Sequence, residues 1–253
     1  MDISALRELY AQRELLAAWE LYRSDLTAPS AEWHLWGSVV GSALQRWYHS
    51  RDAILQALEL PADPELAAKI QHQAGYITRL IGDLPVALEH FNTCLSLLAN
   101  LPGLRPLLWG PCMYNKALTL EHYGRPREAL LLYQQAEQEF ARESMAAYRR
   151  MSLQNAAWVC LDLCEADLAL EVLDEAEPLC ATPDDHWRQR MLRAYHARVI
   201  RSNAEAVRLC RVILEDASVP EEVRCLTACI AADVALDLGL VDDARQMIRV
   251  AEG

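Results

Sequence analysis

One short pattern recurs through this chain at intervals close to the length of a helix pair, and it limits the fold more than any other feature. The pattern is a helix start, an alanine, and then a bulky residue four positions later. It is clearest from Gly82 to Phe91 and from Gly124 to Tyr133. The alanines of successive copies are Ala53, Ala87, Ala129, Ala169, Ala206 and Ala244. A spacing of about 34 to 42 residues predicts a repeat architecture, in which each unit packs on its neighbours.

Each copy of the pattern indicates a tight turn that opens the second helix of a pair. Gly82, Gly124 and Gly239 can end the preceding helix in the left-handed conformation. Pro126 suits the first turn of the next helix, because that position needs no backbone donor. A second small residue lies about one helix length before most of the alanines: Gly75, Ala117, Ala157, Ala194 and Ala232. We therefore expect helix pairs that approach closely at small residues, with a weaker first copy around Ala18 and Tyr22.

Two stretches carry a recognisable family pattern. Gly75-Ala87-Phe91-Cys94 and Ala117-Ala129-Tyr133-Ala136 resemble the tetratricopeptide-repeat (TPR) family, which has a small residue, an alanine, an aromatic residue and a second small residue at these spacings. The resemblance implies an all-α fold, a right-handed superhelical solenoid of about five to seven TPR-like helix pairs. It also implies a single repeat domain over residues 1–253, with a degenerate first repeat over about residues 1–30.

Composition and charge narrow the classes of partner. Alanine and leucine dominate while phenylalanine occurs only twice, a composition that favours helices over strands. The net charge of -12 repels a phosphate backbone, so we expect no direct nucleic-acid partner. The sequence has no signal-peptide pattern and no apolar run of about 18 residues. We therefore expect a cytoplasmic protein without a membrane partner.

The positions of the cysteines and the lack of catalytic motifs argue against a metal site and against enzymatic activity. Three of the eight cysteines fall at packing positions of the repeat: Cys94, Cys160 and Cys210. The pair Cys225 and Cys229 shares a helix face but lacks the further ligands that a zinc site requires. The sequence contains no glycine-rich phosphate loop, nucleophile elbow or metal-binding helix. We expect reduced cysteines, no metal, no cofactor, no catalytic residue and no enzymatic activity.

The resemblance also implies a binding surface. In TPR proteins the first helix of each pair lines a concave face, and solenoids bind their partners there. The groove positions of the family correspond in this chain to Lys69, His72, Tyr76, Arg79, Tyr114, Asn115, Leu118, Gln154, Asn155, Trp158, Arg188, Tyr195 and Arg198. The aromatic residues of this set either form pockets for apolar side chains or pack against the next repeat.

Asn115 and Asn155 occupy the same register in successive repeats. An asparagine amide offers one acceptor and two donors, so it can pair with the N–H and C=O groups of a peptide backbone. In peptide-binding TPR proteins, asparagines at this position play that part. The resemblance therefore implies that Asn115 and Asn155 hold an extended peptide. The alternative is that both amides bond within the helix stack.

These observations lead to two expectations about function. The first is a peptide- or protein-binding scaffold that acts through protein contacts, and it resembles the intracellular peptide-sensing TPR regulators of Gram-positive bacteria. The alternative is a structural adaptor or homo-oligomerisation module without a peptide ligand. Met247, Ile248 and Val250 of the last helix would face no neighbouring repeat, and solenoid ends usually need cover. We therefore also expect a homo-oligomer through the C-terminal edge.

Overall fold

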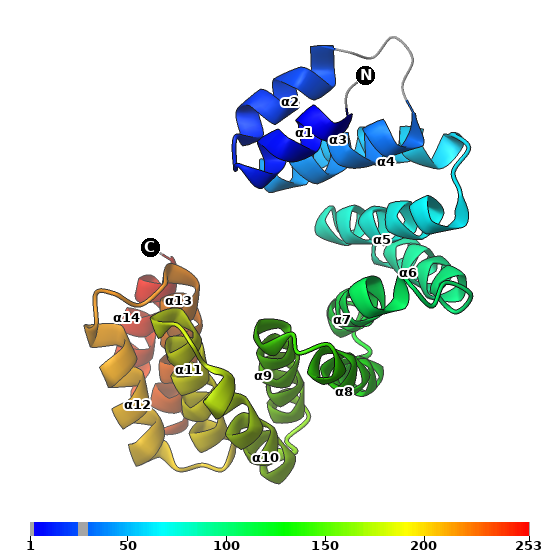
Figure 1. Ribbon diagram of the computed structural model, residues 1–253. Helices are drawn as coiled ribbons and strands as arrows, with labels where there is room; N and C mark the ends of the chain where they lie inside the picture. Colours follow the sequence, from blue (N-terminus) through cyan, green and yellow to red (C-terminus); the bar gives the residue numbers. More distant parts are fainter. Residues whose placement is uncertain (1–2, 25–29, 253) are drawn as a thin grey trace. The chain divides into compact units, whose positions relative to one another are not determined.

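The chain folds into consecutive helix pairs. The computed structural model describes residues 3–24 and 30–252, and the helices found there form seven pairs (Figure 1). They are α1 (Ile3–Ala11), α2 (Leu15–Ser24), α3 (Ala31–Ala43), α4 (Trp47–Glu59), α5 (Pro64–Leu80), α6 (Leu84–Leu98), α7 (Arg105–His122), α8 (Pro126–Arg142), α9 (Ala146–Asp162), α10 (Ala166–Ala176), α11 (Pro183–Val199), α12 (Asn203–Glu215), α13 (Glu221–Asp237) and α14 (Val241–Glu252). A 3-10 turn (Glu177–Leu179) follows α10. The all-α, TPR-like helix pairs that the sequence predicts are confirmed, and the number of pairs is the upper one expected.

The helices gather into two compact units. Unit 1 is Met1–Glu139 and unit 2 is Phe140–Gly253. No linker or change of composition marks this division in the sequence, because it falls inside α8. The predicted degenerate first repeat corresponds to the pair α1 and α2, in which Ala18 and Tyr22 are buried. Residues 1–2 and 25–29 of that predicted repeat lie outside the described residues.

The turn inside every helix pair has the same backbone conformation. The turn residues all have positive φ: Arg13, Gln45, Gly82, Gly124, Cys164, Arg201 and Gly239. At Gly124, the N–H of Arg125 donates to the carbonyl of Leu120 (2.8 Å) and the N–H of Gly124 donates to Glu121 (3.0 Å). This pair of bonds is the Schellman arrangement, which satisfies carbonyls at the end of the helix. The left-handed glycines that the sequence predicts are confirmed.

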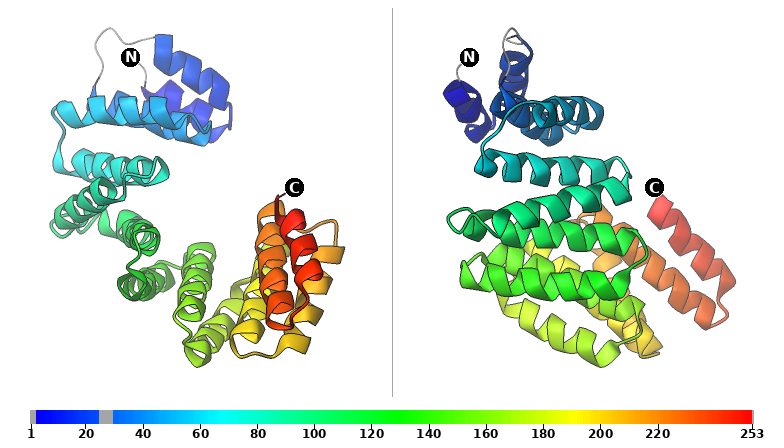
Figure 2. Two further views of the ribbon diagram at one scale, coloured as in Figure 1. Left: turned by 180° about the vertical axis from the view of Figure 1, so that it is seen from behind. Right: turned by 90° about the vertical axis from the view of Figure 1, so that its right-hand side faces the viewer.

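Small residues let the two helices of a pair come close. Gly75 of α5 faces the Phe91 ring of α6, and a Cβ atom added to Gly75 would lie 2.7 Å from that ring. Ala87, Ala129 and Ala169 are fully buried at the corresponding contacts. Helices α5 and α6 lie side by side in every view (Figures 1 and 2). The predicted close approach at small residues is therefore confirmed in these pairs.

The pair α3 and α4 corrects the predicted register. Gln45 is the turn residue of this pair, and it precedes Ser50 by the same interval that separates Gly82 from Ala87. Ser50 Oγ lies 3.0 Å from the Oγ of Ser38 on the facing helix, and both serines are fully buried. Ser50, and not Ala53, therefore holds the close-approach position. The alanine of the predicted pattern was misplaced by about one helical turn, because buried serines stand here where the other pairs have glycine or alanine.

Each unit has its own buried cores. In unit 1 one cluster joins α1–α4 around Trp19, Tyr22 and Trp33, and another joins α5–α7 around Phe91. In unit 2 small clusters of alanine and valine join α11–α14. The predicted buried cysteines Cys94, Cys160 and Cys210 are at most 2% exposed. Among the described residues, no helix combines the length and apolar character needed to cross a bilayer.

Candidate functional site

The predicted groove residues of α5 share one side of that helix. Lys69, His72, Tyr76 and Arg79 follow one another at steps of three and four residues, which return to the same helix face. Lys69 is exposed and the other three are partly buried. The fully buried side chains of α5 pack instead against the helices around it: Ala68, Ile70, Ala74 and Ile77. Packing thus fixes the rotation of α5 and sets the orientation of its polar face.

His72 and Asn115 join the polar faces of α5 and α7. Asn115 Nδ2 lies 3.3 Å from His72 Nε2 and 3.0 Å from the carbonyl oxygen of Pro111, one turn earlier in α7. The Pro111 carbonyl only accepts, so the amide nitrogen must face it, and His72 Nε2 then accepts the second N–H. Burial lowers the pKa of His72 to about 4, partly opposed by a hydrogen bond to the Pro111 backbone. His72 is therefore neutral at physiological pH, as a hydrogen bond donated by Asn115 to Nε2 requires.

Aromatic side chains surround Arg79 at the other end of this face. Its guanidinium carbon lies 5.5 Å from the centre of the Tyr76 ring. Tyr114 of α7 and Tyr133 of α8 also act on it electrostatically, and their rings contact each other edge to face at 5.7 Å. Leu118 lies one turn beyond Tyr114 on α7 and is partly buried. Contacts on and between α5 and α7 therefore bring together five of the predicted groove residues: His72, Tyr76, Arg79, Tyr114 and Asn115.

In unit 2, Asn155 lies in a chain of polar contacts that links α9, α11 and α13. Arg188 Nη2 of α11 donates to Asn155 Oδ1 (3.0 Å), and Arg188 Nη1 lies 3.4 Å from Glu222 of α13. The Asn155 side chain is buried, with an exposed fraction of 8%. A charged donor on Asn155 Oδ1 makes this a charge-assisted hydrogen bond, which is stronger than a neutral one. The side chain of Asn155 is thus held in one orientation by its neighbours.

Trp158, Tyr195 and Arg198 form a second group on α9 and α11. The Trp158 and Tyr195 rings lie 5.2 Å apart. The Tyr195 hydroxyl donates to Asp162 (2.7 Å), and burial together with that carboxylate raises the pKa of Tyr195. Arg198 lies over the Tyr195 ring and forms an ion pair with Asp233 of α13 (3.1 Å). The aromatic pair is partly exposed, so it contributes both to packing and to the surface.

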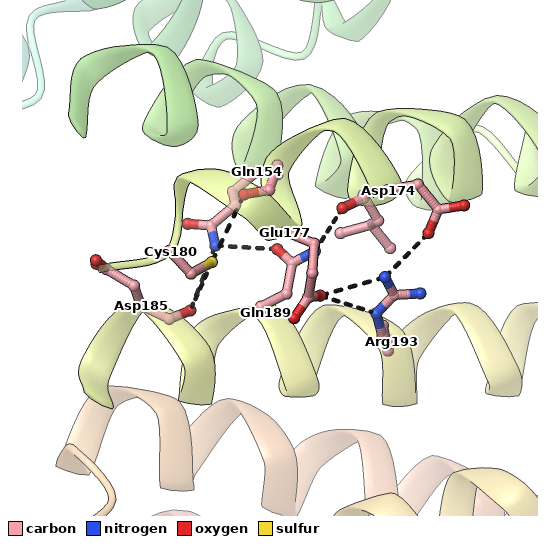
Figure 3. A network of polar contacts seen from close by, with 9 residues as sticks. Gln154, Asp174, Glu177, Cys180, Asp185, Gln189 and Arg193 are labelled. Carbon is pink, nitrogen blue, oxygen red and sulfur yellow. Dashed lines mark hydrogen bonds and ion pairs between the residues drawn. The ribbon is translucent and has the colours of Figure 1, made fainter. Parts of the chain in front are cut away.

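Gln154 differs from the other predicted groove residues, because it is completely buried. Its Nε2 donates to Gln189 Oε1 (3.1 Å), and Gln189 in turn donates to the backbone carbonyl of Leu173 (2.6 Å; Figure 3). Arg150 donates to Gln154 Oε1 (2.8 Å) and forms an ion pair with Asp185 (2.6 Å). The Gln154 amide therefore connects α9 to α11 inside unit 2, and it does not line an open surface.

The sequence reasoning missed the acidic residues that hold the predicted arginines. Glu222 and Asp233 lie on α13, roughly one repeat after their partners Arg188 and Arg198. Applying the groove register to the last first helix would have found Asp233, but Glu222 carries no such signal. The described residues contain no group of three or more histidine, cysteine or acidic residues arranged to hold a metal ion.

An apolar groove lies at the C-terminal end of unit 2. It has a volume of about 550 Å³ and runs between α12, α13 and α14. The large apolar side chains that line it are Leu214, Leu238, Leu240 and Met247. Met247 also packs on a cluster of alanines, whereas Ile248 is 43% exposed. The side chain of Val250, the third residue expected at this edge, lies outside the described residues.

Comparison with known proteins finds similar structures but no similar sequences. No protein-family model matches the chain, and no curated protein matches it. The apo form of RapI has a TM-score of 0.71 at 15% identity, with 98% of this chain and 71% of that chain covered. A Rap protein complexed with competence and sporulation factor has a TM-score of 0.68 at 16% identity, with 98% and 72% covered.

Two further structures extend the same likeness. The apo form of the quorum sensor NprR from B. thuringiensis has a TM-score of 0.67 at 12% identity, covering 98% of this chain and 84% of that one. A tetratricopeptide repeat protein from Parabacteroides merdae has a TM-score of 0.64 at 12% identity, covering 99% and 97%. At these identities the likeness shows the fold, a scaffold of TPR-type helix pairs.

Proposed function

We propose that this chain is a peptide- or protein-binding TPR scaffold, and more narrowly an intracellular peptide sensor that acts through protein contacts. Its binding residues are the partly exposed polar and aromatic side chains of the first helices. These are α5 and α7 in unit 1, and α9 and α11 in unit 2. The names of two similar structures, a Rap protein with a bound factor and a quorum sensor, support the narrower form.

The state of the Asn115 amide is the observation that carries the proposal. Both of its N–H groups are used inside unit 1, on Pro111 and His72, while its Oδ1 has no hydrogen-bond partner among the described residues. A carbonyl oxygen held in a fixed direction at a partly exposed position is suited to accept one backbone N–H of a peptide. Asn115 therefore acts as an oriented acceptor in this proposal. The two-sided pairing that the resemblance implies would require it to leave its internal partners.

A peptide screen tests the proposal at Asn115. A library of short peptides is screened against the full chain, and the affinity of the best binder is measured for the unmodified protein and for Asn115→Ala. Loss of the acceptor should weaken binding by about 1–3 kcal/mol. Asn92→Ala on α6 is the matched control, because Asn92 is exposed on a second helix.

The same variant also tests the alternative role of Asn115 in the helix stack. Asn115→Ala removes two internal hydrogen bonds, so a loss of stability of about 1–2 kcal/mol is expected as well. Affinities are therefore compared at a temperature at which both proteins are folded by circular dichroism. Unchanged affinity together with a lower melting temperature would contradict the binding role and assign Asn115 to the stack alone.

Asn155 is tested separately, because it belongs to unit 2. Asn155→Ala leaves Arg188 with Glu222 as a partner, so the charge of Arg188 stays compensated. Trp158→Ala should change which peptides bind, because an aromatic pocket contacts side chains whereas an amide contacts backbone. If neither variant changes affinity or selectivity, α9 and α11 do not contact the peptide.

The C-terminal groove favours a second candidate function, a homo-oligomerisation module. Leu238 and Leu240, which line the groove, are exposed, and so are Leu236, Val241 and Ile248 elsewhere on α13 and α14. An exposed apolar surface of this kind is typical of an interaction site. In this alternative, a second copy of the chain covers the edge formed by α12, α13 and α14.

A further inference from the structure

The same pair of residues recurs on two first helices. Tyr76 and Arg79 on α5 precede their turn residue, Gly82, by the same intervals at which Tyr195 and Arg198 precede Arg201 on α11. In both copies the arginine lies over the ring of its tyrosine, at 5.5 Å in α5 and 5.9 Å in α11. The two copies are therefore internal equivalents, one in each unit, and their surroundings can be compared position by position.

In unit 2 each residue of this pair contacts a carboxylate of the chain itself. Asp162, at the end of the preceding first helix α9, accepts from the Tyr195 hydroxyl (2.7 Å). Asp233, on the following first helix α13, pairs with Arg198 (3.1 Å). Each polar group of the pair thus has an acidic partner on a neighbouring repeat.

In unit 1 neither carboxylate is present. Counted from the turn residues Gln45 and Gly124, the position of Asp162 is held by Ala43 and the position of Asp233 by Leu118. Both replacements are apolar, so neither can accept from Tyr76 or compensate Arg79. Unit 1 therefore has the same tyrosine and arginine as unit 2 but neither acidic partner.

No other carboxylate of the described residues takes their place. Arg79 forms no ion pair, and its Nε is buried without a hydrogen-bond partner. The Tyr76 hydroxyl also has no partner in the described chain. Glu121 of α7 accepts from the Tyr133 hydroxyl (2.7 Å). A partly buried guanidinium without a counter-charge is costly, because burial penalises its charge and it does not lose its proton at neutral pH.

We propose that Arg79 and Tyr76 form a carboxylate-binding site, and that a carboxylate of the bound peptide pairs with Arg79 as Asp233 pairs with Arg198. The guanidinium donates to the carboxylate oxygens, and the Tyr76 hydroxyl donates as well. The aromatic rings around Arg79 shield the ion pair from water, which strengthens it. This inference rests on the proposed peptide-binding function and specifies what the peptide must carry.

Three pools of random peptides with acetylated N-termini test the site and its ligand. The first pool has free C-terminal carboxylates and contains no Asp or Glu. The second pool contains Asp and Glu but has amidated C-termini, and the third pool has neither kind of carboxylate. Each pool is incubated with the full chain, and the peptides retained through size-exclusion chromatography are identified by mass spectrometry. We expect retention from the first or the second pool, according to whether the terminal or a side-chain carboxylate binds, and little from the third.

Charge variants then assign the preference to Arg79. Arg79→Met keeps an apolar stem against Tyr76 but removes the charge, and it should weaken the selected peptide about tenfold to a hundredfold. Arg51→Met is the matched control. Arg51 also lies over a tyrosine ring, that of Tyr48, but it already pairs with Asp52 on the exposed surface of α4.

A second variant restores the missing carboxylate within the chain. Leu118→Asp places an acid where Asp233 stands in unit 2, so it should pair with Arg79 and exclude the carboxylate of the peptide. Leu118→Asn has nearly the same shape without the charge and should retain the peptide better. This comparison keeps the test informative even if Arg79→Met folds poorly.

The outcomes separate this inference from the function on which it rests. Equal retention from all three pools, or equal affinity of Leu118→Asp and Leu118→Asn, would overturn the carboxylate site while leaving peptide binding intact. Retention from no pool would count against peptide binding itself, and the site would fall with it.

Discussion

His72 is a histidine that the fold keeps uncharged. Its Nε2 must accept from Asn115, so protonation of the ring would turn an acceptor into a donor that faces another donor. Burial lowers the pKa of His72 to about 4, well below the ordinary value near 6.5. Below pH 6.5 the unfolded chain therefore binds a proton that the folded chain does not. The contribution of His72 to stability is complete above pH 6.5 and is lost as the pH falls from 6.5 towards 4.

His72→Gln should remove this acid sensitivity. The glutamine carbonyl can still accept from Asn115, but it does not titrate. We expect the unmodified protein to lose about 1–3 kcal/mol more stability than His72→Gln between pH 7 and pH 4.5. Urea denaturation at several pH values measures the difference. His34 and His90, whose pKa values are also lowered, are present in both proteins and cancel in the comparison. Parallel pH profiles would show that His72 is not held neutral.

At the residue scale the sequence predicted register better than contacts. Gly75, Ala87 and Cys94 could be assigned to the core because the repeat spacing determines which residues face the neighbouring helix. The same spacing placed Gln154 in the groove, whereas it is buried against Gln189. A polar side chain at the edge of a helix–helix interface can point into it when a polar partner lies on the facing helix. Repeat spacing does not reveal such a partner, because Gln189 lies about one repeat after Gln154 in the sequence.

At the scale of the element, the common feature is the left-handed residue between paired helices. Glycine reaches this conformation without steric cost, whereas other residues pay roughly 1 kcal/mol or more for it. The sequence therefore revealed the turns at Gly82, Gly124 and Gly239. It did not reveal those at Cys164 or Arg201, because neither residue type favours a positive φ. The register of α3 and α4 was mistaken for a related reason, because Ser50 lacks the alanine that marks the other copies.

Gly124→Ala should destabilise the chain by about 1 kcal/mol through backbone strain alone. The added methyl group would meet no atom within 4 Å, and φ at this position is +78°. Gly103→Ala is the matched control, because its surroundings are equally open and its φ is not positive. It should be neutral or slightly stabilising. The midpoint of urea denaturation, followed by circular dichroism, distinguishes the two. Equal midpoints would remove the argument from strain.

At the scale of the whole molecule, the homo-oligomerisation alternative requires a second copy to cover the C-terminal groove. If a second copy covers it, Leu240→Glu should shift the chain towards a monomer in light scattering, because Leu240 is exposed and lines the groove, so a charge would enter the apolar contact. Gln246→Glu adds the same charge at an exposed position of α14 that does not line the groove, and it should leave the association unchanged. A protein that is already monomeric at high concentration would exclude this alternative and leave the edge to another partner.

The pattern of packing within each unit has a consequence for biosynthesis. Helices mainly contact helices one or two places along the chain, so the contact order is low and closure of each contact is fast. A ribosome adds about 5–20 residues per second, so a repeat of about 40 residues emerges every few seconds. Helix formation and hairpin docking are much faster than that. Each new pair can therefore dock on the previous one as it leaves the ribosome. The apolar face of a newly made pair then stays exposed only for about the time needed to synthesise one repeat.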